Sequence, residues 1–159
     1  GRVNGRFGDT DWVPIRYLYR NYPRMTLARF YREADVGLIT PLRDGMNLVA
    51  KEFVAAQDPV NPGVLVLSRG AGGADELPEA LIVNPHIPAD VAEGIEQALI
   101  MPLQERRERY RTLMSRIDRH TVVDWGKSFL ADLQGAPVSA GEAEHAWERP
   151  TVSRHPAPR

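Results

Sequence analysis

Short, continuously apolar runs alternate along this chain with segments whose apolar residues recur at helical spacing. The apolar runs are Val36–Thr40, Val64–Ser68 and Ala80–Val83, and each has the length of a strand that is buried in a parallel sheet. Helical spacing is found over residues 25–34, 46–57, 90–101, 103–119 and 121–133. This alternation predicts an α/β fold, with a doubly wound, Rossmann-like parallel sheet that has helices on both faces.

The two ends of the chain have a different pattern. Residues 1–13 are rich in Gly, Asp and Asn and are predicted to be a loop, whereas residues 14–19 alternate between apolar and polar positions and predict one more strand. From residue 134 the composition shifts to Pro, Ala, Gly, Ser and Glu with little periodicity, which is typical of a disordered tail. We therefore expect one ordered region over residues 1–133 and a disordered tail over residues 134–159.

Composition and charge exclude several classes of function. The formal net charge of the 159 residues is −1, which gives no electrostatic basis for binding nucleic acid or an anionic membrane. The sequence has no cysteine, so it has neither disulfides nor thiolate metal sites, and this fits a cytoplasmic protein. No apolar run approaches the roughly 20 residues of a membrane span. Because the chain starts at Gly1 without an initiator Met or an apolar signal core, we expect it to begin inside a larger protein.

Most of the residues suited to binding chemistry lie in one nine-residue block. The block is Asp44-Gly45-Met46-Asn47-Leu48-Val49-Ala50-Lys51-Glu52. Gly45 predicts a sharp turn, and Asn47 stands where the first turn of a helix begins. A helix start exposes unpaired N–H groups and the positive end of the helix dipole, which together suit a phosphate. Asp44 and Glu52 add hydrogen-bond acceptors and Lys51 adds a cation, so the block suits a sugar nucleotide.

The same residues also have purely structural interpretations. Asp44 is able to cap the helix through its side chain, a role that is compatible with sugar binding. Lys51 and Glu52 also fit a solvated helix surface, and Tyr22 fits a packed aromatic residue. A second turn of small residues, 69–73, follows the second apolar run, and there we favour close packing over phosphate binding. Both turns should lie at the carboxyl ends of the strands, where parallel sheets bind their ligands.

The block and its neighbours closely resemble the trehalose-6-phosphate synthases. The resemblance is carried by Asp35–Glu52, with the nine-residue block inside it, and covers residues 1–133. Further matching segments are Val54–Asp58, Pro62–Ser68, Ala80–Pro85 and the helix that contains Trp125. These enzymes are retaining glycosyltransferases of the GT-B fold, which has two facing Rossmann-like domains. The resemblance implies that residues 1–133 form part of the C-terminal, nucleotide-sugar-binding domain of such an enzyme.

The resemblance also implies a reaction and a set of contacts. Members of the family transfer glucose from UDP-glucose to glucose 6-phosphate, which yields trehalose 6-phosphate and UDP. The backbone N–H groups of Met46, Asn47 and Leu48 would bind the diphosphate. Glu52 would accept hydrogen bonds from the ribose, and Asp44, which we take as the catalytic residue, from the transferred glucose.

The resemblance implies further contacts beside those to the diphosphate, the ribose and the glucose. Tyr22 would stand near the nucleotide base, and Val49, Ala50 and Lys51 belong to the same donor-binding stretch. Fixed donors and cations, in place of a metal, would stabilise charge on the leaving diphosphate. The four histidines show no metal-ligand spacing, and we therefore expect neither a metal nor a cofactor.

Important parts of the family's active site are absent from this sequence. The acceptor site belongs largely to an N-terminal domain, and the first half of the donor domain contributes an Arg and a Lys to the diphosphate. We therefore predict that the isolated chain is inactive. The alternatives are a non-catalytic nucleotide-sugar-binding fragment or pseudo-enzyme, and a GT-B transferase that uses another nucleotide-glucose. The preference among UDP, GDP and ADP and the formation of a homo-oligomer are left open by the sequence.

Overall fold

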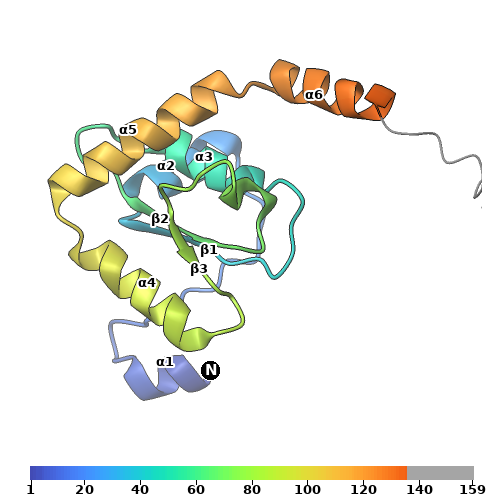
Figure 1. The fold of residues 1–159 in the computed structure, drawn as a ribbon. Coiled ribbons are helices and arrows are strands. Elements are labelled where there is room, and N and C mark those ends of the chain that lie inside the picture. The colour runs from blue at the N-terminus through green and yellow to red at the C-terminus, as the bar shows by residue number, and fades with distance from the viewer. Residues whose placement is uncertain (136–159) are drawn as a thin grey trace, which may run out of the picture. The chain divides into compact units, whose positions relative to one another are not determined.

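The computed structural model describes residues 1–135, where helices and strands alternate (Figure 1). Residues 1–119 form one compact unit, and a second unit begins at His120. The elements in chain order are α1 (Arg2–Phe7), α2 (Arg24–Glu33), β1 (Val36–Ile39), α3 (Leu48–Ala56), β2 (Val64–Ser68), the 3₁₀ turn η1 (Gly72–Ala74), β3 (Leu81–Val83), α4 (Pro88–Ile100), α5 (Leu103–Arg119) and α6 (Val122–Gly135). None of these helices is both long and apolar enough to cross a membrane.

Within residues 1–119 the three strands form one parallel sheet in the order β1-β2-β3. Val36 of β1 is paired with Val64 of β2, and Val66 of β2 is paired with Leu81 of β3. Every residue of β2 is buried, as expected for the central strand of a parallel sheet. The predicted α/β fold with a parallel sheet is confirmed.

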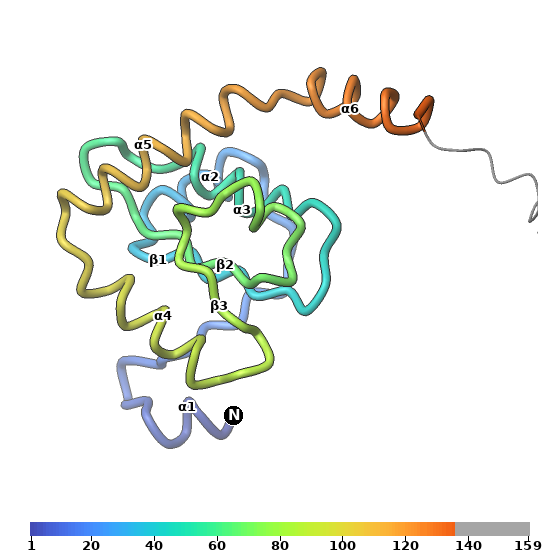
Figure 2. Tube along the Cα trace, viewed as in Figure 1, coloured from blue at the N-terminus to red at the C-terminus, as the bar shows by residue number. Residues whose placement is uncertain are grey.

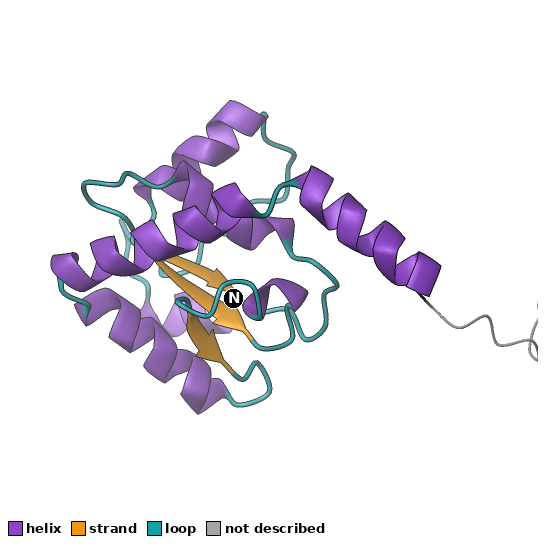
Figure 3. Ribbon diagram, turned by 45° about the horizontal axis from the view of Figure 1, so that its top comes forward, coloured by secondary structure: helices purple, strands orange, loops and turns teal. Residues whose placement is uncertain are grey.

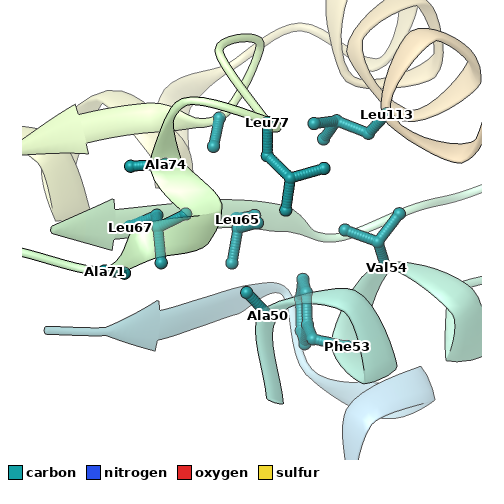
Figure 4. Packing of buried hydrophobic residues seen from close by; sticks show 10 residues of the cluster. Ala50, Phe53, Val54, Leu65, Leu67, Ala71, Ala74, Leu77 and Leu113 are labelled. Atoms are coloured by element: carbon teal, nitrogen blue, oxygen red, sulfur yellow. The ribbon is translucent and has the colours of Figure 1, made fainter. Parts of the chain in front are cut away.

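Helices cover both faces of this sheet (Figure 3). Leu65 and Leu67 of β2 project into one apolar cluster, and Val64 and Val66, at the alternate positions, project into another. Figure 4 shows the first cluster, in which the leucines meet α3 and α5. Its labelled members are Ala50, Phe53, Val54, Leu65, Leu67, Ala71, Ala74, Leu77 and Leu113. The second cluster is closed by Val83 of β3 and by Ala98 and Met101 in and after α4.

The N-terminal segment differs from the prediction. Residues 2–7 form α1 in place of a loop, and residues 14–19 form no strand. The backbone of Ile15 is paired with a side chain: its N–H donates to Asn4 Oδ1 at 2.9 Å, and its carbonyl accepts from Asn4 Nδ2 at 2.7 Å. Tyr19 is 89% exposed, so the alternating pattern has no apolar face to bury. The alternating pattern was insufficient to form a strand here, because a strand also needs a neighbouring strand for backbone pairing.

Most other elements end within a few residues of their predicted limits. α3 begins at Leu48, two residues later than predicted, and α6 continues to Gly135, two residues past the predicted end at Leu133. Inside α6 the rings of Trp125 and Phe129 stack with centroids 5.4 Å apart. The rest of the predicted tail, residues 136–159, lies outside the described part of the chain.

Candidate functional site

Two loops lie side by side at the carboxyl ends of β1 and β2 (Figure 2). We call them the β1–α3 loop (residues 40–47) and the β2–β3 loop (residues 69–80). The Asp44 N–H donates to the Gly70 carbonyl at 3.0 Å, and the Gly72 N–H donates to the Asp44 carbonyl at 2.8 Å. These two bonds make a short parallel bridge outside the sheet. The backbone of Asp44 is therefore held by the β2–β3 loop through both its N–H and its carbonyl group.

The glycines of the β2–β3 loop allow this close approach. A Cβ atom at Gly72 would lie 2.0 Å from the Gly45 carbonyl oxygen, and one at Gly70 would lie 2.4 Å from that of Leu42. Real Cβ atoms do not come that close to backbone oxygen, so a side chain at either position would push the loops apart. The interpretation of this small-residue turn as a packing element is confirmed.

In the turn at the helix start, Asn47 and not Gly45 has the left-handed conformation. Asn47 has φ 58° and ψ 72°, in the left-handed region, and is the non-glycine residue with positive φ among the described residues. Gly45 lies in a bend of the backbone, as expected, but its φ is not positive, so the bend there does not use the conformation that favours glycine. Asparagine tolerates this conformation because its short polar side chain forms local hydrogen bonds. Here Asn47 Oδ1 accepts from the Ala50 N–H at 3.0 Å and caps α3.

The Asp44 carboxylate organises the same turn. Its Oδ1 accepts from the N–H groups of Met46 at 3.3 Å and Asn47 at 3.2 Å, and its Oδ2 accepts from Asn47 Nδ2 at 3.0 Å. Asp44 therefore holds the turn that precedes α3, whereas the N-cap of the helix is Asn47, so the interpretation of Asp44 as the capping residue is wrong. Two of the three N–H groups expected at the diphosphate are occupied by this carboxylate. At the exposed residues Leu48 and Val49, the N–H groups have no acceptor within residues 1–135.

The last three residues of the block differ in their surroundings. The Ala50 side chain is fully buried, so this residue presents only backbone at the helix start. Lys51 Nζ forms an ion pair with Glu76 Oε2 of the β2–β3 loop at 2.5 Å, with 22% of the Lys51 side chain exposed. Glu52 is exposed, and its charge is the second cause, after burial, that raises the pKa of Tyr31 in α2.

Tyr22 packs against the helix that follows it in the sequence. It lies two residues before the start of α2, and its ring packs edge-on against Phe30 of α2 with centroids 5.1 Å apart. Its expected place at the nucleotide base remains a prediction. Within the described residues there is no group of three or more His, Asp or Glu side chains able to hold a metal ion.

Some residues that build this site were not predicted as part of it. Glu76, the partner of Lys51, is separated from it by 25 positions, and no sequence pattern links the two. Ser68 is fully buried, and its Oγ donates to the Pro41 carbonyl at 2.6 Å, which ties the end of β2 to the β1–α3 loop. The capping role of Asn47 did have a signal, since Asn directly before an apolar helical segment is a frequent N-cap.

Comparison with known proteins gives a consistent result. The family model for glycosyltransferase family 20 matches residues 1–135. Trehalose-6-phosphate synthase of Citrobacter koseri is 50% identical over 145 residues, which are 91% of this chain and 31% of that protein. The chain therefore spans about a third of the length of this relative.

Solved structures agree with the sequence comparison. Trehalose-6-phosphate synthase from E. coli bound with UDP-2-fluoro glucose aligns with a TM-score of 0.79 and 50% identity, over 86% of this chain and 30% of that chain. The UDP-forming α,α-trehalose-phosphate synthase from Burkholderia xenovorans in complex with glucose-6-phosphate aligns with a TM-score of 0.79 and 56% identity, over 84% of this chain and 30% of that chain.

Proposed function

Because the chain belongs to glycosyltransferase family 20, we propose that it carries the donor-binding part of a trehalose-6-phosphate synthase. The complete enzyme would transfer glucose from UDP-glucose to glucose 6-phosphate and release UDP. The observation that carries the proposal is the similarity to such synthases, at 50% identity over 91% of the chain. Of the structural neighbours, one is bound with a UDP-glucose analogue and another with glucose 6-phosphate.

The donor would bind along the first turns of α3. The diphosphate would lie at the helix start, where the N–H groups of Leu48 and Val49 are open and the helix dipole is favourable. These donors are fixed by the capped turn before the substrate arrives, so they would stabilise negative charge as it develops on the departing UDP. Glu52, one turn further along, is exposed and would accept hydrogen bonds from the ribose hydroxyls.

Asp44 would contact the transferred glucose. Its carboxylate is exposed at the rim of the helix start and already binds two backbone N–H groups there. A carboxylate oriented in this way has lone pairs left for sugar hydroxyls. Tyr22 would stand at the base end of the donor, and Met46, Asn47, Ala50 and Lys51 would complete the donor-binding stretch around the same turn.

The acceptor would be bound mainly by parts of the enzyme outside this chain. The length comparison supports this proposal, since the chain matches about 30% of each solved synthase. We propose on this basis that the 159 residues alone do not transfer glucose. Cytoplasmic location is also proposed, because a sequence without cysteine suits a reducing compartment.

Calorimetric titration tests the donor assignment. The protein expressed from its complete coding sequence should bind UDP-glucose, and Glu52→Ala should weaken this binding by about 10- to 150-fold, because hydrogen bonds to a charged group contribute about 1.5–3 kcal/mol. GDP-glucose and ADP-glucose, titrated in parallel, identify the preferred nucleotide. Glu96→Ala is the matched control, since Glu96 is an exposed helical glutamate on α4.

Two outcomes would contradict the assignment. Unchanged UDP-glucose affinity in Glu52→Ala would exclude the ribose contact. Failure of the wild-type protein to bind any nucleotide-glucose would exclude donor binding altogether.

A further inference from the structure

The nine-residue donor block is fastened at both of its ends to a single neighbouring loop. At its first residue, the Asp44 N–H is hydrogen-bonded to Gly70 and the Asp44 carbonyl to Gly72. Near its last residue, Lys51 Nζ forms the 2.5 Å ion pair with Glu76. Both attachments reach the β2–β3 loop, which is itself anchored in the core by Leu77, with 1% of its surface exposed.

We propose that Glu76 is a positioning residue for the donor site, acting through Lys51. This inference rests on the proposed donor-binding function. Glu76 follows η1 and directly precedes the buried Leu77. Its backbone is therefore anchored next to the core, which limits the movement of its carboxylate. Lys51 lies one helical turn after Asn47, the cap of α3. The ion pair therefore restrains the helical turn whose open N–H groups would hold the diphosphate.

The geometry also decides against a direct role for Lys51 as the diphosphate cation. An ammonium group 2.5 Å from a carboxylate is already compensated in charge, and its side chain is three-quarters covered. Drawing Lys51 toward a phosphate would require breaking that pair. The two roles make opposite predictions for the removal of the Glu76 charge, so they can be separated by experiment.

The test is a double-mutant cycle in which calorimetry measures the affinity for UDP. It uses the protein expressed from its complete coding sequence. Under the positioning role, Glu76→Gln and Lys51→Met each weaken UDP binding by about 1.5- to fivefold, the range expected for a partly exposed ion pair. The double variant is then no weaker than either single variant, because both remove the same restraint. The charge-swapped variant Lys51→Glu/Glu76→Lys recovers most of the affinity.

A direct phosphate contact by Lys51 gives a different pattern. Glu76→Gln then leaves UDP affinity unchanged or increases it, and the charge-swapped variant binds UDP more weakly than Glu76→Gln. Either result overturns the positioning role. Glu105→Gln is the matched control, because it removes an ion pair of similar exposure, with Arg109 at 2.8 Å on α5, and should leave UDP affinity unchanged.

The wild-type measurement separates this inference from the function on which it rests. If wild-type protein binds UDP and Glu76→Gln binds it equally well, the positioning role fails and the donor function stands. If wild-type protein binds neither UDP nor UDP-glucose, the donor function fails and the positioning role fails with it.

Discussion

The β1–α3 loop and the β2–β3 loop follow adjacent parallel strands at the same edge of the sheet, yet they are built in opposite ways. In the first loop a Cβ atom added at Gly45 would meet nothing within 4 Å, and Asp44 is exposed. In the second loop Ala71 and Leu77 are 3% and 1% exposed. The first loop is open around Asp44 and Gly45, whereas the second is closely packed at Ala71 and Leu77.

This difference shows how the proposed donor site gains its rigidity. A loop that offers N–H groups and a carboxylate to a ligand keeps those groups exposed, so they add little stability through burial. Here the packed loop supplies that stability, through the bridge at Asp44 and the contacts of its glycines with the neighbouring backbone. The three predictions that follow test this division, from the largest expected effect to the smallest.

The first prediction compares a glycine in each loop. Gly72→Ala should lower the free energy of unfolding by about 3 kcal/mol, because its Cβ would lie 2.0 Å from the Gly45 carbonyl oxygen. Gly45→Ala should change it by about 0.5 kcal/mol at most, because the space around Gly45 is open and its φ is not positive. Urea denaturation of both variants measures the difference. Equal effects would remove the distinction between a packed loop and an open one.

The second prediction concerns the left-handed residue of the open loop. Asn47→Ala should lower the free energy of unfolding by about 2–3 kcal/mol, since it removes the N-cap and leaves a Cβ-bearing residue without local hydrogen bonds at φ 58°. Asn47→Gly should cost only about 0.5–1 kcal/mol, because glycine tolerates both the conformation and the cap position. The same denaturation experiment applies, and a glycine variant less stable than the alanine variant would contradict this account.

The third prediction concerns the far end of the packed loop. Glu79 accepts from Arg116 Nε at 2.8 Å and Nη2 at 2.7 Å, and the hydrogen bonds from Arg116 are the main cause that lowers the pKa of Glu79. A carboxylate with a lowered pKa stabilises the fold above its ordinary pKa of 4.5, and this contribution is lost as the pH falls through the lowered value. Glu79→Gln should therefore lower Tm at pH 7 by less than about 4 °C.

Thermal unfolding followed from pH 7 down to pH 2 measures this effect. The wild-type and Glu79→Gln curves should converge as Glu79 becomes protonated in the wild-type protein. A difference in Tm that stays constant over this range would show that the glutamine variant acts through packing and not through charge.

Much of the fold was predictable because it depends on local patterns. The apolar runs at β1, β2 and β3 are too short for helices, so they indicated a parallel sheet. The expected burial was found in full only for the central strand β2, whereas β1 is partly exposed because it lies at an edge of the sheet. The strand predicted at residues 14–19 was wrong, because pairing depends on a partner that periodicity does not reveal. In the structure the Asn4 side chain pairs with that backbone instead.

The candidate site was predictable in its residue types but not in its internal bonding. The sequence by itself determined the nine-residue block, its place after an apolar strand and its family resemblance, since these follow from spacing along one continuous segment. Only the tertiary structure decided that Lys51 pairs with Glu76, that Asp44 is held between Gly70 and Gly72, and that Asn47 has the left-handed conformation. These contacts join residues up to 28 positions apart, and such pairings depend on how the sheet brings its loops together.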